Sequence, residues 1–329
     1  MHRRRRRRRG AGARGAHLRS RRRPGAMLTL APWDPARADE VRRLLGPAPD
    51  HGVSFGRGLC RPDSDGSGPR PFGRARLLLD GDGAPVGVAA VRENPGHPSR
   101  LRAYVEIRPD HRRRGLGTAA LAALGRLAAA EDGRRLHVRC VRGTAGHRFT
   151  EASGGVEIQR ARELRLRPAD LGPPPGGWSV SRQLVGPGTH IPEDCVRAYR
   201  DSFAAGHRDW NPARERTVED CRRDFFTDIP AVFLAVRRPG DGSVAGVAFV
   251  DPPGLDGELF GPDTGFSGWP TDLDDPDGPA IVAALLAAAA REAPDGELVA
   301  EVDDAFRATA AVVDPIVREV LLDLVHAQL

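Results

Sequence analysis

The strongest constraint on the fold is an internal repeat. Residues 82–91 align with residues 241–250 at an offset of 159 residues, and six of the ten positions are identical. Each copy follows an apolar run, residues 77–79 or 232–236, and each begins with an Asp-Gly pair, a common turn in two-stranded hairpins. The repeat therefore predicts two units that share one plan.

The order of elements around the first copy can be followed along the chain. Apolar and polar residues alternate over 101–108, which predicts a strand with one buried face. A glycine-containing turn and an amphipathic helix from about Gly115 to Glu131 follow. Further predicted elements are strands at 136–140 and 156–167, a short helix at 145–153 and a bulge near Arg160.

The second half repeats this order after a Pro/Gly-rich linker at 169–177. The fold class is therefore α/β, a mixed sheet with helices packed on it, built twice, with units at 27–168 and 178–329. In the second unit we expect strands at 178–184, 259–266 and 298–302, and helices at 192–205, 217–226 and 280–292.

Positive charge is concentrated at the beginning of the chain. Residues 1–26 hold twelve arginines and no acid, and the remaining 38 basic residues face 44 acidic ones. Two interpretations are open: a basic arm that binds nucleic acid through its phosphates, or a translation start at Met27, which we favour. The segment lacks aromatic residues for base stacking, so we expect a disordered tail and no specific nucleic-acid partner.

Other classes of protein are excluded by what the chain lacks. No apolar run approaches the roughly 18–20 residues that span a bilayer, and no secretion signal follows the paired arginines. The four cysteines contain no Cys-x-x-Cys pair, which argues against a zinc site or a disulfide framework. We therefore expect a cytoplasmic protein with no membrane and no metal.

The segment that carries chemistry is residues 107–118. A strand ends at Ile107, the chain turns through three arginines, and Gly115 and Gly117 open a helix. The first turn of a helix has free N–H groups and the positive end of the helix dipole. Glycines leave those N–H groups accessible, so the segment predicts a pyrophosphate site.

This segment resembles the coenzyme A signature of the GNAT superfamily of acetyl-CoA-dependent N-acyltransferases. That signature is Gln/Arg-x-x-Gly-x-Gly/Ala after a strand that ends in aliphatic-x-Pro. Arg112, Gly115 and Gly117 take its positions here, and residues 107–109 precede them as Ile-Arg-Pro. The alternative is a glycine-rich strand–helix turn with solvated arginines.

The resemblance covers about residues 27–168, and element order extends it to 178–329 as a second GNAT unit, as in tandem relatives of mycothiol synthase. It implies acetyl-CoA as co-substrate, with its pyrophosphate on N–H groups of 113–118 and its pantetheine arm along the strand edge at 105–107. The implied coenzyme-binding residues are Val105, Glu106, Ile107, Arg112, Arg113, Arg114, Gly115, Leu116, Gly117 and Thr118.

Proton transfer is where the sequence departs from the family. Glu106 and Tyr104, on one strand face, are candidates to accept the proton of the amine; the alternative is that both are structural. The family often places Asn and then Phe-Tyr before the closing strand, where the Tyr protonates the departing thiolate. Gly143 stands at the Asn position and Thr150, a much weaker acid, at the Tyr position.

The second unit lacks the glycine turn. Residues 269–279 stand in its place, and their four aspartates and three prolines would repel a pyrophosphate and remove N–H donors. The aspartate spacing fits no calcium loop, so we expect a solvated acidic loop and a unit without coenzyme A. Residues 206–210 form either a wall of the acceptor cleft or a helix-ending turn around Trp210.

The sequence thus favours an N-acetyltransferase that moves an acetyl group from acetyl-CoA to an amine of a small molecule or peptide, by direct attack in a ternary complex. The alternative is a coenzyme-A-binding module without turnover, which the missing tyrosine and the altered second unit favour. The acceptor cannot be read from the fold, and both a monomer and a homodimer are open.

Overall fold

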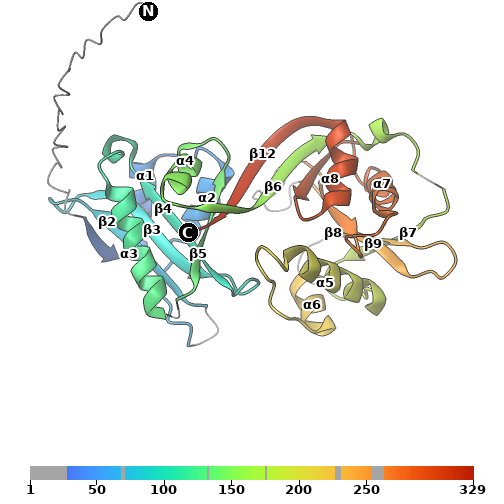
Figure 1. Cartoon of the computed structure of the whole chain (residues 1–329), viewed down its shortest axis with the longest axis horizontal. Coiled ribbons are helices and arrows are strands. Elements are labelled where there is room, and N and C mark those ends of the chain that lie inside the picture. Colours follow the sequence, from blue (N-terminus) through green and yellow to red (C-terminus); the bar gives the residue numbers. More distant parts are fainter. Residues whose placement is uncertain (1–27, 68–70, 132, 175, 227–230, 254–262) are drawn as a thin grey trace, which may run out of the picture.

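The computed structural model describes residues 28–67, 71–131, 133–174, 176–226, 231–253 and 263–329. The Arg-rich segment 1–26 and the first half of the strand expected at 259–266 lie outside these residues. Within the described residues, one mixed sheet of twelve strands runs through the molecule in the order β1-β2-β3-β4-β5-β12-β6-β11-β10-β9-β8-β7, and helices pack against it (Figure 1). The prediction of a mixed sheet with packed helices is confirmed.

The strands divide evenly between the halves. The first half contributes β1 (Thr29–Pro32), β2 (Gly73–Leu79), β3 (Pro85–Glu93), β4 (Arg100–Ile107), β5 (Arg135–Val141) and β6 (Val156–Leu166). The second contributes β7 (Ser179–Val185), β8 (Ala231–Arg237), β9 (Val244–Asp251), β10 (Gly265–Pro270), β11 (Leu298–Asp303) and β12 (Val317–Gln328). Both copies of the repeat form the expected hairpins, β2–β3 and β8–β9.

The helices alternate with these strands. In the first half they are α1 (Ala38–Leu45), α2 (His51–Arg57), α3 (Leu116–Glu131) and α4 (Ala145–Ala152). In the second half they are α5 (Glu193–His207), α6 (Val218–Phe225), α7 (Gly278–Ala289) and α8 (Arg307–Val313). The two sets therefore follow the same order relative to the strands, as the repeat predicts.

The two halves are joined by an exchange of their last strands. β12, from the end of the chain, lies between β5 and β6 and is antiparallel to both. β6, the last strand of the first half, pairs on its other edge with β11 of the second half. Figure 1 shows β12 and β6 running side by side from one half into the other. Each half thus completes its sheet with a strand of the other.

Each half has a core on both faces of the sheet. In the first half, Leu101 and Ile107 of β4 pack against α3, while Tyr104 of the same strand packs beside Val41 of α1. In the second half, one core lies between the sheet and α7, and another lies under α5 and α6. The alternation along β4 therefore separates an apolar face under α3 from a polar face under α1 and α2.

Three details differ from the sequence predictions. The strand expected at 259–266 is β10 at Gly265–Pro270, so Trp269 and Pro270 are strand residues and not part of the acidic loop. No element was expected after residue 302, where α8 and β12 lie. The bulge expected near Arg160 is present, and the register of β6 with β12 skips Ile158.

Candidate functional site

β4 and β5 separate soon after they begin to pair. They are parallel neighbours only over three pairs of residues, from Arg100 with Arg135 to Arg102 with His137. β4 continues to Ile107 and β5 to Val141, so beyond residue 102 the facing edges of both strands are unpaired. A wedge-shaped gap therefore opens in the middle of the sheet, with free backbone groups on its β4 side.

The backbone groups that face this gap follow from the alternation of a strand. The N–H of Arg108 donates to the carbonyl of Val86, on the β3 side of β4. Alternate residues present their backbone groups to the same edge, so Ala103, Val105 and Ile107 present theirs to the gap. The Arg112 side chain donates to the Ile107 carbonyl over 2.8 Å, which leaves the N–H and C=O of Val105 accessible from the gap.

The glycine turn stands at the end of this strand. Gly115 has φ +83° and Arg113 has φ +63°, left-handed conformations that aim successive amides to one side. Among the described residues, no hydrogen-bond acceptor is found for the backbone N–H groups of 113–118, while the Ala119 N–H already donates to the Gly115 carbonyl. A Cβ atom at Gly115 would meet nothing within 4 Å, so this cluster of amides is open on its outer side.

The three arginines of the turn do different things. Arg112 holds the end of β4 through the Ile107 carbonyl, and Arg114 donates to the Asp110 carbonyl over 2.8 Å. Arg113 is exposed and makes no hydrogen bond or ion pair among the described residues. Arg113 is therefore the arginine most free to reach a phosphate, whereas Leu116 is buried in the core under α3 and offers only its N–H.

Tyr104 and Glu106 form a connected group on the other face of β4. The Tyr104 hydroxyl donates to a Glu106 carboxylate oxygen over 2.7 Å, and the Arg57 guanidinium donates to both oxygens over 2.8 Å each. Glu106 is only 8% exposed. Burial and the neighbouring carboxylate raise the pKa of the Tyr104 phenol above its ordinary value, so the phenol is a neutral donor at working pH.

A cavity of about 40 Å³ opens where β4 and β5 begin to separate. It lies on the polar face, under α2, and Tyr104 lines it while Glu106 stands behind the phenol. A Cβ at Gly56 of α2 would lie 2.2 Å from the Tyr104 ring, so only a glycine lets the helix come this close. The lining residues are Phe55, Gly56, Leu59, Arg102, Ala103, Tyr104, His137, Arg139 and His326.

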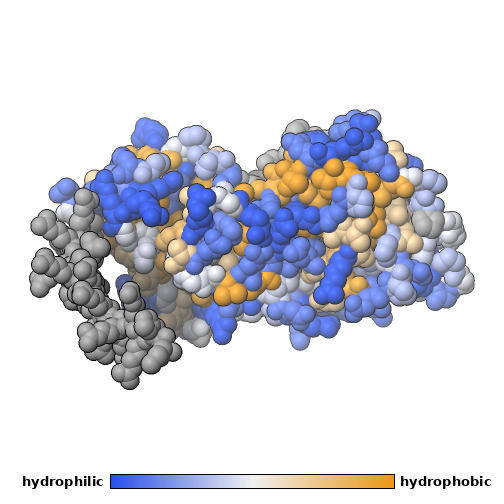
Figure 2. Space-filling model, turned by 45° about the horizontal axis from the view of Figure 1, so that its top comes forward, coloured by the Kyte–Doolittle hydropathy of each residue, from blue (hydrophilic) through white to orange (hydrophobic). Residues whose placement is uncertain are grey.

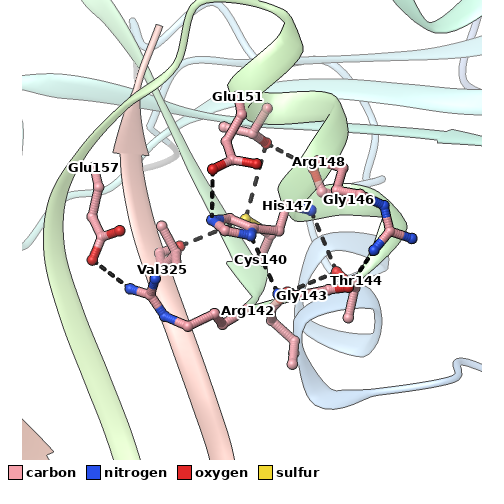
Figure 3. A network of polar contacts seen from close by, with 12 residues as sticks. Cys140, Arg142, Gly143, Thr144, Gly146, His147, Arg148, Glu151, Glu157 and Val325 are labelled. Carbon is pink, nitrogen blue, oxygen red and sulfur yellow. Dashed lines mark hydrogen bonds and ion pairs between the residues drawn. The ribbon is translucent and has the colours of Figure 1, made fainter.

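α4 carries the position at which the family often has a tyrosine. Thr144 caps the helix and accepts from the His147 N–H, and the His147 ring accepts from the Gly143 N–H over 3.2 Å (Figure 3). The Thr150 hydroxyl is buried and donates to the Gly146 carbonyl over 3.0 Å. Thr150 is thus held inside α4 against β5, and its proton is already in use.

The second half reaches the cavity through β12 and Trp210. His326 of β12 lines the cavity and lies 3.0 Å from the His137 ring, nitrogen to nitrogen. The Trp210 ring packs on His326 with centroids 5.1 Å apart, and its N–H donates to the Gly206 carbonyl. Residues 206–210 therefore support a wall of the cavity from behind and also end a helix around a packed tryptophan.

The start of α7, in the second half, is built differently. N–H groups of Asp274, Asp275 and Asp277 donate to acceptors within the same turn, and the Gly278 N–H donates to the Asp275 carbonyl. The Asp275 carboxylate is buried and pairs with Arg238. A Cβ at Gly278 would lie 2.9 Å from Ala308 of α8. This helix start is therefore internally satisfied and covered.

Sequence reasoning missed Arg57, Phe55, Arg139 and the two cavity histidines. These residues come from α2, β5 and β12, which only the strand exchange and the packing of α2 bring together. Residues 46–73, which include α2, show no clear pattern in the sequence, so no local signal marked Phe55 or Arg57. A larger cavity of about 300 Å³ lies between α5 and α6, and none of the predicted site residues lines it.

The glycine turn, the gap and the cavity all lie within one segment. Residues 51–154 match the Acetyltransferase (GNAT) family. The matched segment, about a third of the chain, holds α2, β4, the turn and α4. No curated protein matches this chain in a sequence comparison.

Solved structures show that the GNAT fold extends over most of the chain. A GCN5-related N-acetyltransferase from Sphaerobacter thermophilus aligns with a TM-score of 0.55 at 14% identity, over 92% of this chain and 95% of its own. A tandem GNAT protein from the clavulanic acid biosynthesis pathway aligns with a TM-score of 0.56 at 17% identity, over 92% and 98%. A fungal GCN5-related glucosamine N-acetyltransferase region within a multi-domain β-N-acetylglucosaminidase gives 0.58 at 11% identity, over 92% and 38%.

These neighbours show a GNAT fold over most of the chain, consistent with the two units that the repeat predicted and with the GNAT fold that the resemblance implied. Among the described residues, no helix combines the length and the apolar character that crossing a membrane requires. Likewise, no cluster of three or more His, Cys, Asp or Glu side chains in the described part of the chain is arranged to hold a metal ion.

Proposed function

We propose that the protein is an acetyl-CoA-dependent N-acyltransferase whose coenzyme site lies in the first half. The observation that carries this proposal is the open gap between β4 and β5 beside a glycine turn with free amides, within the GNAT segment. The chemistry of the donor set fits the coenzyme, because convergent N–H groups at a helix start bind pyrophosphate. Bound acetyl-CoA would supply an activated acetyl thioester at the gap.

The residues of the turn and of β4 would divide the work of binding. N–H groups of 113–118 would hold the pyrophosphate, with Arg113 reaching the phosphates from outside. Val105, which presents its N–H and C=O to the gap, would pair with the pantetheine arm as an added strand does. Arg112 and Leu116 would act through position alone, since one holds the Ile107 carbonyl and the other packs under α3.

Tyr104 and Glu106 would handle the proton of the acceptor amine. Tyr104 lines the cavity, and its hydroxyl oxygen would accept a hydrogen bond from the amine while its own proton points at Glu106. Glu106 would take that proton as the amine gives up its own to Tyr104, and Arg57 holds the carboxylate in place through two hydrogen bonds. Tyr104 is then the group that touches substrate, and Glu106 acts through it.

We propose a supporting role for the second half. Its helix start at α7 is filled by its own aspartates, and Pro270 has no N–H to offer at the end of β10. This half would complete the sheet of the first half with β12 and hold the cavity wall through Trp210. The proposed boundaries 27–168 and 178–329 then divide the sequence into two units with the same order of elements. In space the units are interlocked, because β6 pairs with β11 of the second unit and β12 pairs with strands of the first.

A coenzyme-A-binding module without turnover is the second candidate. It is favoured by Thr150, whose hydroxyl is held inside α4 and leaves no phenol to protonate a departing thiolate. Both candidates require the same coenzyme site, and only turnover distinguishes them.

The experiment that tests the proposal is calorimetry with acetyl-CoA, followed by thiol release with a panel of amines. Binding with thiol release in the presence of an amine supports the N-acyltransferase. Binding without thiol release for every amine supports the module without turnover. No heat of binding would contradict both.

A further inference from the structure

Two arginines line the cavity at the strand gap, and neither forms an ion pair with a carboxylate among the described residues. Arg102 of β4 and Arg139 of β5 both line the cavity, and each guanidinium carbon lies 5.0 Å from the centroid of the Phe55 ring. Among the described residues, neither arginine forms an ion pair, and the Nε of Arg139 is buried without a hydrogen-bond partner. Two cations thus face one small space.

The other groups of the cavity do not balance these charges. Burial lowers the pKa of His137 to about 3 and also holds the pKa of His326 well below its ordinary value, so both rings are neutral. The Tyr104 phenol is neutral as well. Glu106, the acid nearest to that phenol, is already paired with Arg57. The cavity therefore carries positive charge.

Carboxylates of the paired strands β6 and β11 act on Arg139 only from a distance. Glu301, Glu163 and Asp303 favour its charged form, yet in the described residues none of them lies within ion-pair distance of it. None of them influences Arg102, whose pKa falls to about 10 because of burial and then repulsion from Arg139. Burying a charge is unfavourable unless it is paired, so the cavity holds two incompletely compensated cations.

A comparison within the chain shows what is missing. Arg216 also stacks on a phenylalanine, with its guanidinium carbon 5.0 Å from the Phe225 centroid, and it also donates to Asp224 over 3.2 Å. Arg216 therefore has both an aromatic support and an anion. Arg102 and Arg139 have the aromatic support alone.

We propose that Arg102 and Arg139 bind an anionic group, a carboxylate or a phosphate, on the acceptor amine. Guanidinium groups bind both kinds of oxyanion through paired N–H donors. The cavity of about 40 Å³ has room for such a group, because a single water needs only about 10–15 Å³ of the same kind of volume. This inference rests on the proposed function, since it names the acceptor of that site.

The spacing along β4 narrows the class of acceptor. Arg102 and Tyr104 lie two residues apart on the same strand face, which separates their Cα atoms by roughly 6–7 Å. The amine that Tyr104 receives and the anionic group that Arg102 receives are therefore a few bonds apart. Amino acids and aminoalkyl phosphates have this arrangement, whereas simple alkylamines lack the anion.

The first test compares acceptors and variants in one assay. The wild-type protein, R102M, R139M and the matched control R216M are assayed with an amino acid panel, with aminoalkyl phosphates and with alkylamines of similar length. We expect wild type to prefer one of the two anionic classes, and R102M and R139M to lower kcat/KM for that class at least about tenfold while R216M keeps the preference. A wild-type preference for alkylamines, or an equal loss for all amines, would overturn the proposal.

The second test separates this proposal from the coenzyme site. The thermal midpoint of each protein is measured against acetate and against inorganic phosphate, without acetyl-CoA, and acetyl-CoA binding is measured by calorimetry. We expect one anion to raise the midpoint of wild type and R216M in a concentration-dependent way, but not of R102M or R139M, with acetyl-CoA affinity within about twofold in all four. Stabilisation that persists in both arginine variants, or is absent from wild type, would overturn the anion site, while failure of acetyl-CoA alone to bind would overturn only the proposed function.

Discussion

The two halves follow one plan and treat the start of their central helix in opposite ways. At α3, left-handed residues 113 and 115 turn the amides outward, and these amides have no acceptor among the described residues. At α7, buried Asp275 and its neighbours bond the amides of their own turn, and α8 covers the helix start at Gly278. The same strand–turn–helix thus serves as an open anion site in one half and as a closed structural joint in the other.

The strand edges differ in the same sense. Val105 on β4 offers both an N–H and a C=O to the gap. On β10, the Gly268 carbonyl accepts from the Thr309 hydroxyl of α8 over 2.9 Å, and Pro270 has no N–H. β10 and β11 also pair over only two residue pairs, so the gap itself is present in both halves. The two halves differ in what occupies the gap: in the second half Thr309 of α8 bonds to the edge of β10, whereas the edge of β4 stays open.

The largest effect is expected from ending the chain after Ile316, which removes β12. Because β12 pairs with both β5 and β6, the loss opens the sheet of the first half as well as that of the second. We expect no cooperative unfolding transition by circular dichroism. A chain that starts at Met27 keeps every described strand and serves as the control; a native melting curve for the truncated chain would show that the halves are independent.

Replacing the open glycine should abolish coenzyme binding. Gly115→Val places a β-branched residue at φ +83° and puts methyl groups in front of the amides, so we expect acetyl-CoA affinity to fall about 100-fold or more by calorimetry. Gly125→Ala, in the middle of the same helix and in open space, is the control and should bind normally. Equal affinity for Gly115→Val and wild type would place the coenzyme elsewhere.

The equivalent change in the second half should affect stability alone. Asp275→Ala removes the buried partner of Arg238, which keeps only its longer ion pair with Asp277, and removes an acceptor of the Asp277 N–H. We expect a loss of about 2 kcal/mol in the free energy of unfolding by urea denaturation. Acetyl-CoA affinity should stay within about twofold of wild type, because the proposed coenzyme site lies at the start of α3 and not at α7. A large loss of coenzyme affinity would give α7 a role that its closed start does not suggest.

Glu106→Gln tests the proton path on the open side. The amide can still accept from Tyr104 but takes up a proton poorly, so we expect kcat to fall about tenfold or more with acetyl-CoA affinity unchanged. Glu93→Gln, which changes an ion-paired glutamate on β3 instead, is the control and should keep its kcat. An unchanged kcat for Glu106→Gln would make the glutamate a purely structural partner of Arg57.

The smallest effect concerns the shared centre of the sheet. Burial and then the facing Glu301 raise the pKa of Glu163 from 4.5 to about 7. Between pH 4.5 and 7 the native state holds this proton and the unfolded state does not, so this group makes stability fall as pH rises through that window. Glu163→Gln should therefore raise the thermal midpoint at pH 8 relative to wild type and change it little at pH 4. An equal change at both pH values would contradict this assignment.

Much of this organisation was visible in the sequence because it is local. The hairpins at residues 82 and 241, the helix after Gly115 and the acidic turn between β10 and α7 each follow from short-range patterns, although β10 extends over the first two residues of the turn expected at 269–279. The strand exchange was not visible, since no local pattern tells β12 to pair with β5 rather than with a strand of its own half. In that pairing, Val325 lies opposite Cys140, which is 185 residues earlier in the chain.

The cavity shows the same limit. Tyr104 and Glu106 were singled out because they lie on a strand that the alternation at 101–108 predicts. The positions of Phe55, Arg57 and Arg139 in the cavity region depend instead on how α2 and β5 pack around that strand. The sequence singled out Thr150 as a departure from the family pattern, and the structure adds that its hydroxyl donates to the Gly146 carbonyl. Residues from separate elements converge through packing, which spacing along one chain does not encode.

The exchanged strands also set the order of events during synthesis. β5 and β6 leave the ribosome long before β12, which ends at Gln328, so the first half must wait on the order of 10–30 s with two strand edges exposed. Exposed edges invite pairing with other nascent chains. The protein therefore completes its sheet late and in a single step. Its need for chaperones should be highest just before residues 317–328 emerge.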